Sequence, residues 1–205
     1  HAIIRNLSSA ESLGATTVIC SDKTGTLTKG EMTVRRIYDG KIVEVSGVGY
    51  EPKGDYNVGN DSISPKDDKD LLMTLTIGSL CSNATLEKEN NAWQILGDPT
   101  EGALIVAAAK AGLERAELEE IYTRIGEIPF TSEKKRMTTI HSTLDGENIA
   151  FMKGAPEVVL ERSMYVFENG KEKKLTDSKR RELLEINEKL ASDALRVLGM
   201  AYKKL

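Results

Sequence analysis

The segment Ser21–Thr28 places one carboxylate, Asp22, at the end of an apolar run and follows it with a turn rich in hydroxyl groups. The preceding run, Thr16–Cys20, is short and β-branched, which predicts a buried parallel-type strand that ends where the turn begins. In open α/β sheets, reactive groups collect beyond the carboxyl ends of strands. A carboxylate held there can attack the terminal phosphorus of a nucleotide and form an acyl phosphate, while a divalent cation neutralises the phosphate oxygens. The segment therefore indicates covalent phosphoryl transfer with Asp22 as the nucleophile.

The turn after Asp22 has residues that suit a phosphate ligand. Gly25 lets the backbone approach a ligand closely, and Thr24 and Thr26 offer hydroxyl and main-chain groups to phosphate or metal. The competing interpretation is a solvated turn without chemistry, because Asp and Gly favour turns in any protein. The complete octapeptide is far less compatible with that alternative than a bare Asp-Lys-Thr-Gly would be.

Residues Asp22–Thr28, Asp-Lys-Thr-Gly-Thr-Leu-Thr, resemble the phosphorylation signature of P-type cation-transporting ATPases and match it at every position. The resemblance implies catalytic roles for Asp22, Lys23 and Thr24, and a Mg²⁺ ion held by Asp22 and Thr24. Related phosphatases of the haloacid-dehalogenase type carry a second Asp two residues after the nucleophile as general acid and base. Thr24 stands there in this chain, which removes a contribution of about 10²–10⁴-fold to proton transfer. A lasting pump intermediate is therefore favoured over a phosphatase.

Composition excludes several other classes. The 205 residues carry a formal net charge of −4, which argues against a nucleic-acid binder because no basic stripe would neutralise a phosphate backbone. Two cysteines and two histidines provide neither a disulfide framework nor a metal cage, and they fit a reducing cytosolic setting. The most apolar stretch, residues 103–109, is too short to span about 30 Å of hydrocarbon.

Beyond residue 31, hairpin signals alternate with amphipathic helical patterns, which predicts an α+β domain on an antiparallel sheet. Turn dipeptides occur at Asp39-Gly40, Asp145-Gly146 and Asn169-Gly170. We expect hairpins at 32–45 and 165–175, a surface loop at 47–60, helices at 67–82, 100–111, 114–122, 155–162 and 176–193, and strands at 124–128, 137–143, 149–152 and 194–202. Ser64 is expected to cap the first of these helices.

The resemblance divides the chain into residues 1–30, part of a haloacid-dehalogenase-like α/β phosphorylation domain, and residues 31–205, a nucleotide-binding domain. Four patches carry it in the second part. The first is Gly97–Leu104, which contains a helix start with Asp98 as N-cap, Pro99 at the first helical position and Glu101 reaching back as a capping box. The resemblance adds that Thr100 and Glu101 lie near the adenine edge, and both interpretations can hold.

The second patch, Ile128–Met137, has an aromatic residue before consecutive cations. A core position for Phe130 and a solvated basic turn are the commoner outcome for such residues. The resemblance implies instead that Phe130 stacks on adenine and that Lys135 approaches the phosphates. Lys134 stands where the family frequently has arginine, which puts only its own contact in doubt.

The third and fourth patches supply further cations. Lys153 and Gly154 lie at a predicted strand end before a helix N-terminus, a favourable arrangement for an anion, and they resemble the deep-pocket motif of the ATP site. Arg196 lies in an apolar stretch that predicts a strand, where a buried guanidinium needs a carboxylate or a phosphate as partner. The resemblance favours nucleotide phosphate, and an ion pair is the alternative.

The resemblance runs from Ile3 to Tyr202 and implies a soluble piece from the cytoplasmic face of an ATP-driven cation pump, with Ca²⁺ favoured as the transported ion. Its partners would be ATP, Mg²⁺, the actuator domain, the rest of the phosphorylation domain and the transmembrane helices that hold the ion. We expect the chain alone to bind ATP with little or no turnover. A nucleotide-binding regulatory module without covalent chemistry and a haloacid-dehalogenase-like phosphatase stay as alternatives.

Overall fold

The computed structural model describes residues 11, 14–22, 26 and 30–205. The chain divides into two compact units, His1–Glu31 and Met32–Leu205. In the first unit, the buried strand predicted over Thr16–Cys20 is wrong, because these residues belong to no sheet and are exposed. Val18 and Ile19 are 73% and 84% exposed. A strand needs a neighbour for its hydrogen bonds, and the described residues of this unit include none.

The main sheet of the second unit has the order β12-β9-β8-β7 and is antiparallel throughout. Its strands are β7 (Tyr122–Ile128), β8 (Arg136–Thr143), β9 (Asn148–Gly154) and β12 (Gly199–Lys204). Alternate residues of the two central strands are buried, as expected for a sheet with one face on the core. Phe151 is fully buried there. The register places Gly154, at the end of β9, between Arg136 of β8 and Gly199 of β12.

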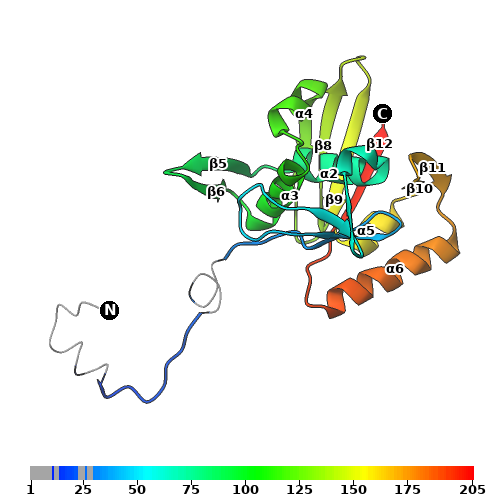
Figure 1. Ribbon diagram of the computed structural model, residues 1–205. Helices are drawn as coiled ribbons and strands as arrows, with labels where there is room; N and C mark the ends of the chain where they lie inside the picture. The colour runs from blue at the N-terminus through cyan, green and yellow to red at the C-terminus, as the bar shows by residue number, and fades with distance from the viewer. Residues whose placement is uncertain (1–10, 12–13, 23–25, 27–29) are drawn as a thin grey trace. The chain divides into compact units, whose positions relative to one another are not determined.

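Three helices pack on this sheet (Figure 1): α2 (Lys69–Leu80) and α5 (Pro156–Glu161) contact β9 and β12, and α4 (Arg115–Ile121) contacts β7. A further helix, α3 (Pro99–Lys110), packs on α2 and α4. The core between the sheet, α2 and α4 contains Leu80, Cys81 and Leu118 together with sheet residues such as Phe151. The N-cap of α2 is Asp68, whose carboxylate accepts from the amides of Asp70 and Leu71. The expectation that Ser64 caps this helix is therefore wrong, because a separate 3₁₀ turn, η2 (Pro65–Asp67), comes first.

A second, smaller sheet has the order β1-β2-β3-β4 and is made of short strands. They are β1 (Arg36–Tyr38), β2 (Ile42–Val45), β3 (Tyr56–Val58) and β4 (Asp61–Ile63). Val43, Tyr56 and Leu71 join the cluster that packs this sheet against α2 and α3. The hairpin predicted around Asp39-Gly40 is confirmed. The surface loop predicted over 47–60 is wrong at its end, where β3 lies.

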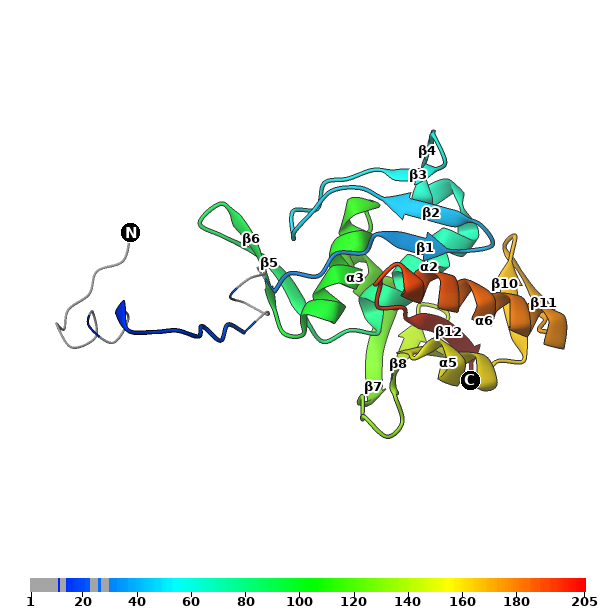
Figure 2. The same cartoon turned by 90° about the horizontal axis from the view of Figure 1, so that it is seen from below.

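The remaining elements are two hairpins and a helix. They are the hairpins β5 (Thr85–Glu89) with β6 (Ala92–Leu96) and β10 (Tyr165–Glu168) with β11 (Lys171–Lys174), and the helix α6 (Asp177–Ser192). The first hairpin extends away from the body of the second unit (Figure 2). Thr176 caps α6 by accepting from the amide of Lys179, as the sequence predicts. Within the described residues, no helix combines the length and the apolar character that a membrane crossing requires.

Candidate functional site

Lys153 is the most buried cation of the predicted site. It lies next to the end of β9 and is only 8% exposed. Its ammonium nitrogen is 2.8 Å from Glu101 Oε1 and 2.9 Å from Ser82 Oγ. Burying an ammonium group is costly unless it is paired and hydrogen-bonded. The strand end and the first turn of α3 are therefore joined by an ion pair that shields a cation from solvent.

Glu101 reaches this pair from the first turn of α3. Asp98 caps the helix as predicted, because its carboxylate accepts from the amides of Thr100 and Glu101 at 2.7 and 3.2 Å. The expectation that Glu101 completes a capping box is wrong. Its Oε2 accepts instead from the amides of Asn83 and Ala84 at 2.6 and 3.0 Å. These two amides follow the end of α2 and both donate to the carboxylate. A capping box would give Glu101 only one amide donor, so the carboxylate is better satisfied here.

Gly154 brings the second and third patches into contact. A Cβ atom built on it would lie 2.5 Å from the carbonyl oxygen of Lys135 and 2.7 Å from Arg136 Cβ. The next amide, that of Ala155, donates to the same carbonyl at 3.0 Å. Only glycine permits this approach without a shift of the backbone. Lys135 itself has a φ of 49°, which is unusual for a residue with a side chain.

Phe130 lies on the surface, in the segment between β7 and β8. Its side chain is 59% exposed, so the alternative of a core aromatic is excluded. Lys135, at the other end of the same connection, is also exposed. The connection between β7 and β8 therefore offers an exposed aromatic ring and an exposed cation, and Lys135 adjoins the end of β9 through its carbonyl.

The expected strand around Arg196 is wrong. β12 begins only at Gly199, and Arg196 lies in the connection after α6, where Ala194 has a φ of 59°. The guanidinium is exposed and its Nη1 donates to Thr100 Oγ1 at 2.9 Å. Because Arg196 is exposed, its remaining donors are open to solvent and do not require the carboxylate or phosphate partner that burial would have required.

The four patches are thus connected by direct contacts. Arg196 contacts Thr100, whose neighbour Glu101 pairs with Lys153, and Lys153 precedes Gly154, which packs on Lys135. Sequence reasoning missed Ser82, because this serine just after α2 belongs to no motif. Only the fold brings its hydroxyl to Lys153.

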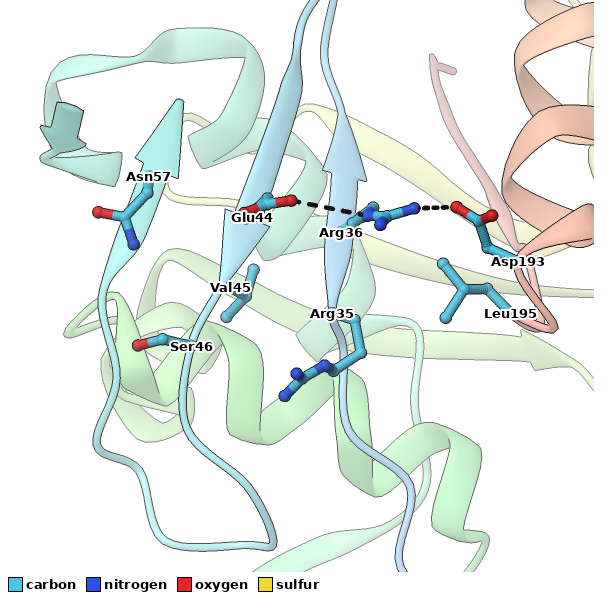
Figure 3. Close-up of a pocket in the computed structure, with 8 residues that line it drawn as sticks. All are labelled: Arg35, Arg36, Glu44, Val45, Ser46, Asn57, Asp193 and Leu195. Atoms are coloured by element: carbon cyan, nitrogen blue, oxygen red, sulfur yellow. Dashed lines mark hydrogen bonds and ion pairs between the residues drawn. The ribbon is translucent and has the colours of Figure 1, made fainter. Parts of the chain in front are cut away.

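A cavity of about 300 Å³ lies elsewhere, between β1–β3 and the end of α6. Figure 3 shows Arg36 placed between Glu44 and Asp193, and it forms an ion pair with each. None of the residues predicted to bind nucleotide lines this cavity. Both carboxylates that line it, those of Glu44 and Asp193, are paired with Arg36.

The residues proposed for phosphoryl transfer belong to the first unit. Asp22 is described and exposed, whereas Lys23 and Thr24 lie outside the described residues. Across the part of the chain that the structure describes, no three His, Cys, Asp or Glu side chains gather in a way that would hold a metal ion.

Known proteins resemble this chain over its whole length. It is 39% identical to the calcium-transporting ATPase of Bacillus subtilis over 205 residues, which is 100% of this chain and 23% of that protein. It is 42% identical to the cation-transporting ATPase pma1 of Synechocystis, covering 99% of this chain and 23% of the relative. It is 40% identical to the calcium-transporting ATPase type 2C member 1 of Bos taurus, covering 98% of this chain and 21% of the relative. The chain spans only 21–23% of the length of these relatives.

A family model described as "P-type ATPase, cytoplasmic domain N" matches residues 70–205, which contain all of the main sheet and the helices that pack with it. The match includes the patches that carry Glu101, Phe130, Lys153 and Arg196. This chain therefore belongs to the P-type ATPases and contains their cytoplasmic domain N.

Proposed function

We propose that this chain is the ATP-binding part of an ATP-driven cation pump and that Ca²⁺ is the transported ion. The proposal is supported by the names of the relatives, two of which are calcium-transporting ATPases. The observation that carries it is the series of contacts that connects four sequence patches through the Glu101–Lys153 pair, with Phe130 exposed in the same connection as Lys135. Any ion-binding residues would belong to transmembrane helices of the pump, and the actuator domain would be a further partner.

The cluster offers each part of ATP a suitable group. Phe130 presents an exposed ring on which adenine can stack, a contact worth about 1–3 kcal/mol. Thr100 and Glu101 lie at the start of α3, where they would face the edge of the base. Lys135 and Arg196 are exposed cations, and Lys153 and Gly154 would line the pocket. Cations and close backbone approach are what a polyphosphate requires.

We further propose that Asp22 is the phosphoryl acceptor, within a haloacid-dehalogenase-like phosphorylation domain to which residues 1–30 contribute. A carboxylate oxygen of Asp22 would bond to the terminal phosphorus as ADP departs. Mg²⁺ would accompany the phosphates and neutralise charge, with Asp22 and Thr24 as its proposed protein ligands. Because electrostatic stabilisation dominates phosphoryl transfer, we expect the chain without the rest of that domain to turn over little ATP. Steady turnover that disappears in Asp22→Asn would contradict this expectation.

The test is a calorimetric titration of the 205-residue chain with ATP. Loss of the stacking contact in Phe130→Ala removes about 1–3 kcal/mol, so affinity should fall by about 5- to 150-fold. Tyr165→Ala is the matched control, because Tyr165 is a similarly exposed aromatic, 57% against 59%, in the β10–β11 hairpin. The site assignment fails if both variants bind ATP as the unmodified chain does.

A further inference from the structure

Ser82 is a fully buried serine just after α2, in contact with the predicted site. Its hydroxyl donates to the carbonyl of Gly78 at 2.8 Å and accepts from Lys153 Nζ at 2.9 Å. A hydroxyl has one donor and two acceptor lone pairs, so the bond to Gly78 directs the lone pairs toward Lys153. We propose that Ser82 is a positioning residue that aims the Lys153 ammonium group at the nucleotide. The proposal rests on the proposed function of the site.

The segment around Ser82 is held from both sides. Arg115 and Arg124 donate to the carbonyl of Ser82 at 3.0 and 3.3 Å, and Arg115 also donates to the carbonyl of Ala84 at 2.7 Å. The amides of Asn83 and Ala84 bind Glu101 on the opposite side. The same short segment therefore fixes both acceptors of Lys153, directly through Ser82 Oγ and indirectly through Glu101.

The hydrogen bonds of Lys153 leave one donor for a ligand. An ammonium group has three N–H donors, and Ser82 and Glu101 accept one each. Among the described residues, none accepts from the third. A lysine side chain also loses rotamer entropy when it is ordered. Because Ser82 and Glu101 already order this side chain in the free protein, the entropy loss does not reduce the affinity for a ligand.

The experiment compares serine variants of the 205-residue chain by ATP titration calorimetry, with folding checked by far-ultraviolet circular dichroism. We expect Ser82→Ala to weaken ATP binding by about tenfold, because Lys153 then becomes ordered only when ATP binds and the lost rotamer entropy counts against binding. Ser82→Thr keeps the hydroxyl and should restore most of the affinity. Ser79→Ala is the matched control, since Ser79 is equally buried and, among the described residues, its hydroxyl has no partner.

A folded Ser82→Ala variant that binds ATP as tightly as the unmodified chain would overturn the proposal. So would an equal loss of affinity in Ser79→Ala, because the effect would then be general loosening of this region. If Ser82→Ala does not fold, Ser82→Cys replaces it with a weaker acceptor of similar size, and unfolding of both variants would assign Ser82 to stability alone. Absence of ATP binding by the unmodified chain would instead refute the proposed function itself.

Discussion

Gly154→Ala should destabilise the second unit, because the new methyl group has no room. It would lie 2.5 Å from the Lys135 carbonyl oxygen, 2.7 Å from Arg136 Cβ and 2.9 Å from Arg136 Cα. Two of these atoms belong to the backbone of the neighbouring strand end, so rotation of a side chain cannot relieve the overlap. The strands must separate locally, which also stretches the 3.0 Å hydrogen bond from the amide of Ala155.

The magnitude follows from those contacts. Overpacking in a well-packed region costs about 1–3 kcal/mol, and a weakened backbone hydrogen bond adds about 0.5–1.5 kcal/mol. Alanine recovers about 0.4–1 kcal/mol through the lower entropy of the unfolded chain. We therefore expect a net loss of about 2 kcal/mol, or a decrease of about 4–8 °C in melting temperature for a domain of this size.

Gly126→Ala provides the comparison, because Gly126 lies on β7 of the same sheet and its new methyl group would meet only Ile140 at an ordinary 3.6 Å. Urea unfolding followed by far-ultraviolet circular dichroism should show a lower midpoint for Gly154→Ala and an unchanged or higher midpoint for Gly126→Ala. Equal midpoints for the two variants would refute the reasoning, since the expected difference comes from the space available to the new methyl group.

Three further outcomes are expected. Glu101→Gln should lower the free energy of unfolding by about 3 kcal/mol, because it leaves the buried Lys153 ammonium without its counter-charge; a urea midpoint within experimental error of the unmodified chain would contradict this. Lys135→Gly should raise stability by up to about 1 kcal/mol, since it relieves a φ of 49°, yet it should weaken ATP binding; lower stability in urea would show that the backbone is not strained there. Burial lowers the pKa of His141 from its ordinary 6.5, so the unfolded chain takes up a proton more readily than the native one below that pH. The contribution of His141 to the free energy of unfolding should therefore be fully present above pH 6.5 and decline as the pH falls. The decline should be smaller in His141→Gln, and identical pH profiles of the urea midpoint in both proteins would exclude this histidine as the cause.

Local sequence signals predicted the elements whose ends are set by their own residues. Asp98 and Thr176 cap α3 and α6 because their side chains reach amides only two or three residues away. The turn Asn169-Gly170 closes its hairpin because both residues adopt positive φ values of 56° and 71°. These features depend on near neighbours alone, so a single sequence contains the information they need.

The strands that sequence reasoning missed are short or polar. β5, Thr-Leu-Glu-Lys-Glu, has only one partly buried position, so it lacks the alternation that marks a half-buried strand. Its turn, Asn90-Asn91, is a weaker hairpin signal than Asn-Gly, although both residues adopt positive φ values. β3 has only three residues and pairs with β2 across a long connection. Whether such a segment forms a strand depends on the neighbouring strand with which it pairs, and its own residues do not indicate that strand.

The sequence resemblance names residues of the candidate site, but it does not say which of them contact one another. Motif resemblance selected Glu101 and Lys153 separately, 52 positions apart, and local reasoning assigned Glu101 to a capping box that does not form. Whether a carboxylate turns to its own helix or to a distant ammonium group depends on what the fold brings near it. The same limitation hid Ser82, which has no motif and acquires its place only through contact with β9.

The Glu101–Lys153 pair also decides which cations can distinguish ATP from its nucleoside. The side chains of Lys153 and Glu101 are only 9% and 15% exposed and neutralise each other, so Lys153 presents little net charge to a ligand. Arg196 is bound to a neutral hydroxyl, and among the described residues no carboxylate pairs with Lys135 or Arg196. Both of these cations therefore keep their full charge at the surface, where salt screens it over about 8 Å at physiological ionic strength. Discrimination for the phosphates should thus depend on Lys135 and Arg196, and retention of the base on Phe130.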